Sequence, residues 1–335
     1  MALLFFTGFE NEDGYEGDYC SLSQSATQKR TGSFSGLCNA NNLYLGFYYT
    51  GSEKTFIVGQ ALRISQDSYS GGFQISNSTG IQLCVQLVGS AGGNSVYLRR
   101  GDYNDTIIAQ STSSFYINTW YYLEAKITIN NTTGSAIVKV DETEVINVSG
   151  VDTQAGSTDE ITAFTFPLYV NSRCYIDDLY ICDTTGSVNN DFLGPVRVEG
   201  LQPSGNGYNS DFVGSDADST DNYLHVDEVP ADDDTSYIKS STNGHIDSFA
   251  LGNLTGSVNS IKGIKVNSVA KVSDTFARNY KNLVRVNGTN YLGSDNNPDT
   301  SYNNNFDIWE EDPDTATGWT ETGVNAIEVG VEITS

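Results

Sequence analysis

The sequence predicts an all-β protein made of two β-sandwich, jelly-roll-like domains in tandem. Three observations predict it: short segments in which apolar and polar residues alternate, a composition rich in Tyr, Phe and Gly, and the lack of a sustained helical apolar stripe. Aromatic and β-branched side chains suit pleated sheets, and Gly, Asn and Asp suit the tight turns between strands. A chain of 335 residues is long enough for two domains that each bury a core.

The expected strands of the first half begin with the apolar run at residues 3–6, and residues 81–87 alternate as a second strand. Residues 120–129 place their apolar side chains on one face. These side chains belong to Leu123, Ala125, Ile127 and Ile129.

A probable hairpin follows, with strands at 137–140 and 145–148 and a turn at 141–143. Residues 164–170 alternate as another strand, and the segment 175–183 closes this half of the chain.

A polar, turn-prone stretch then marks a domain boundary near residue 190. We expect domains at 1–185 and 195–335, joined by a linker at 186–194. The strands expected after the boundary lie at 196–200, 236–240, 260–270, 282–286 and 326–333. Long acidic or Asn-rich loops at 205–234 and 293–317 are interpreted as binding loops, assembly contacts or partly disordered segments.

The formal net charge is −25, and it is distributed over both halves. Such a charge repels polyanions, so we expect no nucleic-acid partner and no binding to acidic membranes. A solvated surface explains the charge most simply; cation binding or a basic docking partner is the alternative. The sequence contains no run of 18 apolar residues, the length that a membrane-spanning helix needs. The apolar N-terminal run is too short for a signal peptide.

Five cysteines all precede residue 185, and none shows the paired spacing of a zinc site. Most are interpreted as small buried hydrophobes, and a bridge between Cys20 and Cys38 stays open. Only two histidines are present, His225 and His245, and we interpret both as surface or partly satisfied residues. The sequence therefore predicts no nucleophilic triad.

Five features of the first half carry a family resemblance: residues 6–10, 31–36 and 120–124, the hairpin around Asp141, and residues 175–180. In this order they resemble the concanavalin A-like lectin/glucanase superfamily, in its LamG-like branch, over residues 3–183. The resemblance implies a jelly-roll sandwich of two antiparallel sheets. Some relatives cleave polysaccharides with carboxylates that alternate along one strand, a pattern this chain lacks. We therefore expect no enzymatic activity.

The second half resembles structural proteins of tailed bacteriophages, through residues 194–198, 232–238 and 309–315 and the terminal strand. This resemblance implies a non-enzymatic virion protein on the particle exterior: a capsid decoration, spike or tail-associated subunit. Its expected partners are other virion proteins and further copies of itself. The expected location is the virion, after assembly in the host cytoplasm.

The alternative function is a host-adhesion module that binds a surface glycan through the first sandwich. The aromatic residues that could stack on a sugar include Tyr44, Phe47 and Tyr122, and the candidates chosen from the set are Tyr48, Tyr49, Tyr97, Tyr103 and Tyr121. Packing within the core is the simpler role for each of these rings. Adjacent strand residues face opposite sides, so one member of the pair Tyr48–Tyr49 must leave the core.

We expect no cofactor, although Ca²⁺ is possible. Asp216, Asp218 and Asp221 have a spacing similar to that of a calcium loop. The loop lacks the glycine at its sixth position and the closing glutamate, so a solvated acidic loop is the alternative interpretation.

Overall fold

The computed structural model describes residues 2–10, 18–168, 173–274 and 278–335 and confirms the all-β fold. The chain forms two compact units, residues 1–199 and 200–335, so the segment 186–194 lies within the first. In the described residues, helix is confined to the single turns η1 (Asn222–His225) and α1 (Glu321–Val324). Neither has the length and apolar character of a membrane-spanning helix.

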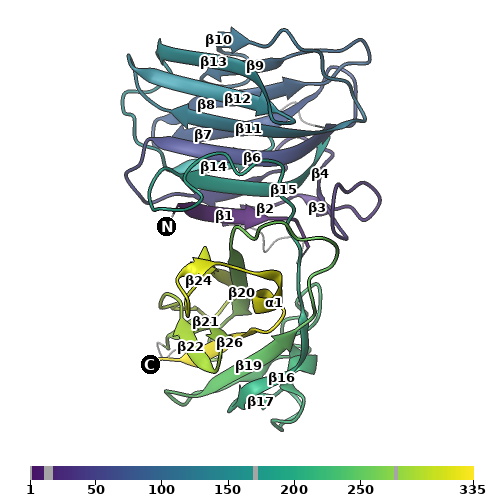
Figure 1. The fold of residues 1–335 in the computed structure, drawn as a ribbon, viewed down its shortest axis with the longest axis vertical. Coiled ribbons are helices and arrows are strands. Elements are labelled where there is room, and N and C mark those ends of the chain that lie inside the picture. The colour runs from purple at the N-terminus through teal and green to yellow at the C-terminus, as the bar shows by residue number, and fades with distance from the viewer. Residues whose placement is uncertain (1, 11–17, 169–172, 275–277) are drawn as a thin grey trace. The chain divides into compact units, whose positions relative to one another are not determined.

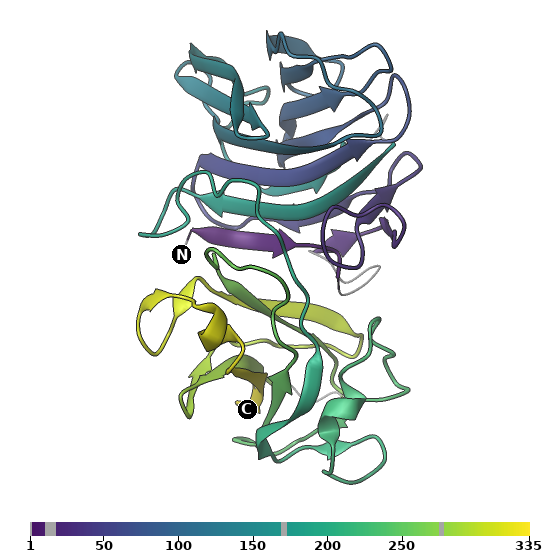
Figure 2. The ribbon, with the colours of Figure 1, turned by 45° about the vertical axis from the view of Figure 1, so that its right-hand side comes forward.

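The first unit is a sandwich of two antiparallel sheets (Figures 1 and 2). The eight-stranded sheet runs in the order β13 (Thr143–Val151), β12 (Gly134–Val140), β11 (Trp120–Thr128), β6 (Thr55–Ile64), β15 (Cys174–Asp183), β4 (Gly36–Cys38) and β3 (Ser23–Gln24), and β1 (Leu3–Thr7) also pairs with β15. The seven-stranded sheet runs β10 (Thr106–Gln110), β9 (Val96–Arg100), β8 (Gly80–Val88), β7 (Ser70–Asn77), β14 (Ala163–Phe166), β5 (Leu45–Tyr48) and β2 (Tyr19–Cys20).

The core of this unit lies between the two sheets and is aromatic. Phe56 of β6 meets Phe164 of β14 edge-on, with ring centroids 5.0 Å apart. Phe5 of β1 stacks on Phe47 of β5 at 5.2 Å. Because these pairs join one sheet to the other, they fix which face of each strand points inward.

Most strands expected in this half are present, and the hairpin turn is a two-residue turn. Asp141 and Glu142 both adopt positive φ, 47° and 65°, as the connection between β12 and β13 requires. The strand expected at 164–170 corresponds to β14, and residues 169 and 170 lie outside the described part of the chain. The central strand β6 was not predicted, because it is buried on both faces and lacks alternation.

The second unit is built on one five-stranded antiparallel sheet (green to yellow in Figure 1). Its order is β16 (Pro203–Ser210), β19 (Ile246–Leu251), β26 (Glu328–Ile333), β21 (Tyr280–Val286) and β22 (Thr289–Leu292). The ladder of β20 (Ile264–Ala270) with β23 (Asn303–Trp309) contributes Val266 to the core formed on β21 by Val284 and Val286. Shorter ladders join β17 (Val213–Gly214) to β18 (Ile238–Lys239) and β24 (Glu311–Asp312) to β25 (Thr317–Gly318).

Three sequence expectations for this half were wrong. The segments expected as long loops, 205–234 and 293–317, contain most of β16 and all of β23. Strand β16 is rich in Gly, Ser and Asn, and β23 begins with three Asn residues, so their ladders form with little of the apolar alternation that reveals a strand in sequence. Residues 196–200 form no strand; their backbone groups bond to side chains instead.

Candidate functional site

A cluster of buried acidic residues lies on the outer face of the eight-stranded sheet. Asp177 and Asp178 sit at a bulge in the pairing of β15 with β6, and Asp178 takes a positive φ of 48°. Both side chains are completely buried, and so is nearly all of Glu124 on β11. We call these three carboxylates the acid cluster. Carboxylates are buried in this way either at catalytic sites, where burial shifts their pKa, or where their hydrogen bonds and ion pairs hold parts of the fold together.

The hydrogen bonds of the two aspartates favour the structural role. Asp177 Oδ2 accepts from the backbone N–H groups of Arg30 and Thr31, at 2.8 and 3.2 Å. Asp178 accepts from the Arg30 guanidinium at 2.6 Å and the Thr31 hydroxyl at 2.7 Å. Asp178 also accepts from the backbone N–H of Val198 at 2.8 Å. The cluster therefore fastens the 30–31 turn and the segment 191–199 onto the sheet.

Glu124 fastens the same segment from β11, which β6 separates from β15. Its Oε1 accepts from the Tyr180 hydroxyl at 2.5 Å and from the backbone N–H of Gly194 at 3.0 Å. The backbone N–H of Leu193 in turn donates to the Tyr180 hydroxyl at 3.1 Å. The acid cluster is thus covered by its own chain.

Electrostatics agree with this assignment. Burial, and then the adjacent charge of Asp178, raises the pKa of Asp177 to about 8. Burial also raises the pKa of Asp178, whose carboxylate is paired with Arg30. The Arg30 guanidinium lies over the Tyr122 ring, 4.9 Å from its centroid. A single compensated charge on Asp178, with Asp177 disposed to be neutral, is what a dry site requires.

A row of residues crosses the outer face of the seven-stranded sheet, and it is exposed at its Tyr19 end while Cys84 and Gln74 in its middle are buried. The register sets one row across this face: Arg99 of β9 lies opposite Cys84 of β8, which lies opposite Gln74 of β7. The row continues through Thr165 of β14 to Gly46 of β5 and ends at Tyr19 of β2. Their strand neighbours Phe73, Val85 and Phe164 point into the core, so by alternation the row faces outward.

Three tyrosines surround Gly46 at one end of the row, and we call them the tyrosine cluster: Tyr19, Tyr44 and Tyr48. The Tyr19 and Tyr44 rings lie 4.9 Å apart, and a side chain built on Gly46 would contact the Tyr44 ring. Tyr19 is 46% exposed and Tyr48 60% exposed. Rings left at the surface of a sheet otherwise well covered form a platform for a ligand.

Polar side chains occupy the other end of the row. The Gln74 side-chain amide donates to the Asp102 carboxylate at 2.5 Å, and the side-chain oxygen of Gln86 accepts from Arg99 Nε at 3.0 Å. Arg99 also donates to the Asp105 carbonyl at 2.9 Å. Gln74 and Gln86 are buried, and they hold the half-buried Asp102 and Arg99 in fixed positions at this end of the row.

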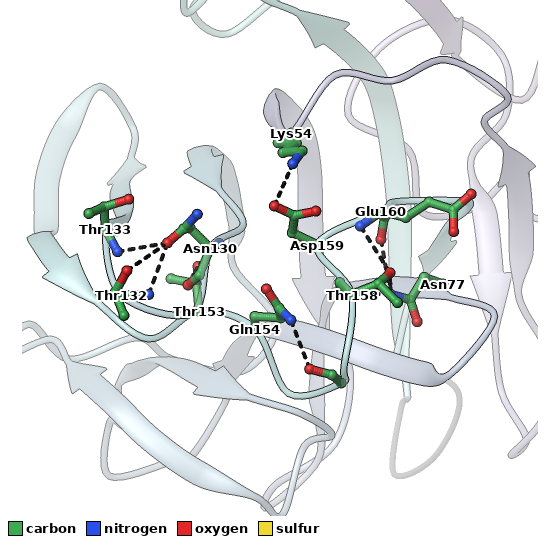
Figure 3. Close-up of polar contacts among 11 residues, drawn as sticks. Lys54, Asn77, Asn130, Thr132, Thr133, Thr153, Gln154, Thr158, Asp159 and Glu160 are labelled. Carbon is green, nitrogen blue, oxygen red and sulfur yellow. Dashed lines mark hydrogen bonds and ion pairs between the residues drawn. The ribbon is translucent and has the colours of Figure 1, made fainter.

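The loop at 152–161 holds β14 in the middle of this face (Figure 3). Asn77 at the end of β7 donates to the carbonyls of Thr158 and Glu160 at 3.1 and 3.0 Å. Lys54 forms an ion pair with Asp159. On the other side of the loop, the Thr153 hydroxyl accepts from the backbone N–H of Asn130 at 2.9 Å. The loop therefore fixes the placement of Ala163 and Thr165 beside β7.

The structure distributes the five predicted tyrosines over different environments. Tyr48 and Tyr97 lie on the outer face of the seven-stranded sheet, and Tyr103 lies in the 101–105 loop whose Asp102 bonds Gln74. Tyr49 packs edge-on against Phe56 of the core, with ring centroids 5.0 Å apart. Tyr121 packs edge-on against Phe115, with ring centroids 5.2 Å apart.

The sequence-based argument included Tyr44 but missed Tyr19 and the polar residues of the row. Glutamines at alternate positions of apolar strands were the available signal. Gln74 lies between Phe73 and Ile75, and Gln86 between Val85 and Leu87. Only the register shows that they share a face with the tyrosines.

Two of the three predicted metal ligands bond through their side chains within their own loop. Asp216 accepts from the backbone N–H of Asp218 at 3.2 Å and lies 3.4 Å from the His225 ring. Asp218 accepts from the backbone N–H of Thr220 at 2.7 Å. Across the described ranges, no group of three or more His, Cys, Asp or Glu side chains is placed to hold a metal. Calcium binding by Asp216, Asp218 and Asp221 stays a prediction.

Both histidines contact serines. His225 Nδ1 lies 3.4 Å from the Ser215 hydroxyl, and His245 Nδ1 lies 2.9 Å from that of Ser240. The Ser215 backbone N–H is already bonded to the Tyr237 carbonyl, so that amide offers no donor for an oxyanion.

Comparisons with known proteins give a partial likeness in fold. No family model and no curated protein matches the chain. Among solved structures, alginate lyase Aly36B is 14% identical with a TM-score of 0.38, covering 53% of this chain and 96% of its own. Domain 4 of AbnA, a GH43 extracellular arabinanase from Geobacillus stearothermophilus in complex with arabinotriose, is 12% identical with a TM-score of 0.35. That match covers 54% of this chain and 92% of the arabinanase domain. The Caenorhabditis elegans galectin LEC-6 is 9% identical with a TM-score of 0.30, and the match covers 43% of this chain and 92% of the galectin.

Proposed function

We propose that the first unit binds a neutral glycan on the outer face of its seven-stranded sheet. The observation that carries the proposal is the tyrosine cluster, in which Tyr19 and Tyr48 remain exposed around a side-chain-free position at Gly46. A tyrosine ring presents an apolar face to the C–H side of a sugar and a hydroxyl to its polar rim. The half-buried Asp102 and Arg99, which the buried Gln74 and Gln86 hold in place, then supply hydrogen bonds for sugar hydroxyls.

The charge of the chain selects the class of glycan. A net charge of −25 repels sulfated or uronic polysaccharides at physiological salt. Arg99, the cation in the row, already donates to Gln86 and Asp105. A neutral glycan therefore suits this face better than an anionic one.

Binding without cleavage is part of the proposal. Hydrolysis of a glycosidic bond normally needs two carboxylates placed on either side of that bond. The paired carboxylates of this unit, Asp177 and Asp178, lie on the other sheet, buried and hydrogen-bonded to the 30–31 turn and Val198. We assign no catalytic residue.

The experiment is a glycan array probed with the full chain, followed by titration of the strongest neutral ligand. Tyr48→Ala should weaken binding about tenfold, because it removes an exposed ring that contributes only to the ligand contact. Stability should change by no more than about 0.5 kcal/mol.

Tyr208→Ala is the matched control, since Tyr208 is 75% exposed in the second unit. Equal affinity of both variants, or no binding of any neutral glycan by the wild type, would contradict the proposal.

Assembly into a tailed-phage particle stays a prediction from the sequence resemblance, and it is compatible with glycan binding. An adhesion module on a particle would contact a host surface polysaccharide through the same face. Mass spectrometry of purified particles tests it: the chain must be found at constant stoichiometry with the other virion proteins.

A further inference from the structure

Two cysteines face each other across neighbouring strands of the eight-stranded sheet. Cys38 of β4 lies directly opposite Cys174 of β15 in the antiparallel register. Opposed residues in such a pair have Cα atoms about 4.5–5.5 Å apart, within the range of about 4.4–6.8 Å that a disulfide spans. The two thiols are also hydrogen-bonded to each other. The geometry of a cross-strand bridge is therefore present in the dithiol form.

The two thiols differ in character. The hydrogen bond from the Cys174 thiol lowers the pKa of Cys38, while burial raises the pKa of Cys174. The neighbouring Arg173 charge favours the Cys38 thiolate further. By contrast, burial raises the pKa of Cys84, and no second cysteine lies opposite it in the register. Cys38 is thus suited to attack a disulfide, and Cys174 to complete the exchange.

Access to the pair is controlled by the turn at residues 39–43. The Cys38 sulfur lies 3.3 Å from the Ala40 carbonyl and 3.5 Å from that of Leu43, within S–H hydrogen-bonding range. Cys38 itself is only 1% exposed, whereas residues 39–42 are at the surface. Opening of this short turn, without separation of the sheets, would expose the thiol.

We propose that Cys38 and Cys174 form a reversible oxidation site that accepts a low-molecular-weight disulfide such as oxidised glutathione. The Cys38 thiolate attacks one sulfur of that disulfide, forming a mixed disulfide and releasing one glutathione thiol. The Cys174 thiol then attacks the Cys38 sulfur, releasing the second glutathione. Two protein thiols are oxidised by two electrons, one external disulfide is reduced, and the two thiol protons leave on the released glutathiones.

The bridge would join strands separated by more than a hundred residues of chain, so it should raise the melting temperature. It also removes the Cys38 S–H from the turn that leads directly into Tyr44. The oxidation itself is independent of glycan binding, so the two proposals can fail separately.

The test is incubation of the full chain with oxidised glutathione, followed by peptide mapping without reduction. The expected product is one Cys38–Cys174 peptide pair, loss of two of the five thiols, and a melting temperature higher by several degrees that dithiothreitol reverses. Cys182→Ser is the matched control, because Cys182 is a buried cysteine of the same strand; this variant should still form the bridge.

Cys38→Ser and Cys174→Ser should each abolish the bridge. If either variant does not fold, the wild-type map alone decides the question. Retention of all five thiols, or a bridge between any other pair such as Cys20 and Cys38, would overturn the proposal.

Discussion

Asp177 shows how a single residue sets the pH response of the first unit. Its carboxyl lies between Asp178 and the 30–31 turn, and its pKa is raised to about 8 from an ordinary value near 3.8. The folded state therefore binds more protons than the unfolded state between these two pH values. This contribution to stability is complete below about pH 4 and is lost as the pH rises to about 8.

Asp177→Asn should remove that dependence. The amide keeps an oxygen for the backbone N–H groups of Arg30 and Thr31 but cannot ionise. We expect the melting temperature of the variant to gain a few degrees on the wild type between pH 5 and pH 8. Thermal melts at both pH values check this; parallel profiles for the two proteins would show that Asp177 does not titrate in this range.

At the scale of elements, the pairing of β6 with β15 depends on a missing side chain. Gly59 of β6 lies opposite Tyr180, and a Cβ at Gly59 would come within 2.1 Å of the Tyr180 ring. The ring in turn donates its hydroxyl to Glu124. A small residue at Gly59 is therefore required for Tyr180 to lie flat across the strand and reach its partner.

Gly59→Ala should destabilise the chain by about 1–3 kcal/mol, because the ring must shift in a fully buried place. Gly205→Ala in the edge strand β16 is the control, since a Cβ there meets nothing within 4 Å. Chemical denaturation of both variants measures the difference. Equal free energies of unfolding would mean that Tyr180 moves without cost.

At the scale of the whole chain, the segment 186–199 is part of the first unit and not a free linker. Backbone donors at Leu193, Gly194 and Val198 bond to Tyr180, Glu124 and Asp178. A polar, turn-prone composition predicted a linker here because sequence shows no partner for such a segment. The partners are buried side chains of strands far away in sequence.

A fragment of residues 1–185 should therefore be less stable than one of residues 1–199. Removing the segment deletes the hydrogen bonds that its backbone donates to Tyr180, Glu124 and Asp178, at a cost of about 2–5 kcal/mol, or about 10 °C in melting temperature. A third fragment, with 186–199 replaced by a Gly/Ser segment of equal length, keeps the backbone donors but loses their fixed placement, so it should melt between the other two. If all three melt together, the segment contributes nothing to the unit.

The fold class and seven strands of the first unit follow from the sequence, most clearly residues 120–128, where apolar and polar residues alternate. Strands β2 to β7, β9 and β10 were not predicted. Strand β6, buried on both faces, and the polar strands β16 and β23 could not be recognised by alternation, because they show little of the pattern. The motifs at 6–10, 31–36 and 175–180 meet in space: Glu10 accepts from the backbone of Ser33, and Asp177 from that of Thr31. Their proximity is a property of register, which the sequence alone does not reveal.

The most direct measurement is a calorimetric titration of a neutral glycan, selected on the array, into the wild type and the Tyr19→Ala/Tyr48→Ala double variant. The account predicts a saturable isotherm for the wild type and at least a tenfold weaker one for the variant, with unchanged melting temperatures. An isotherm that is the same for both proteins would contradict the assignment of the ligand to this sheet face.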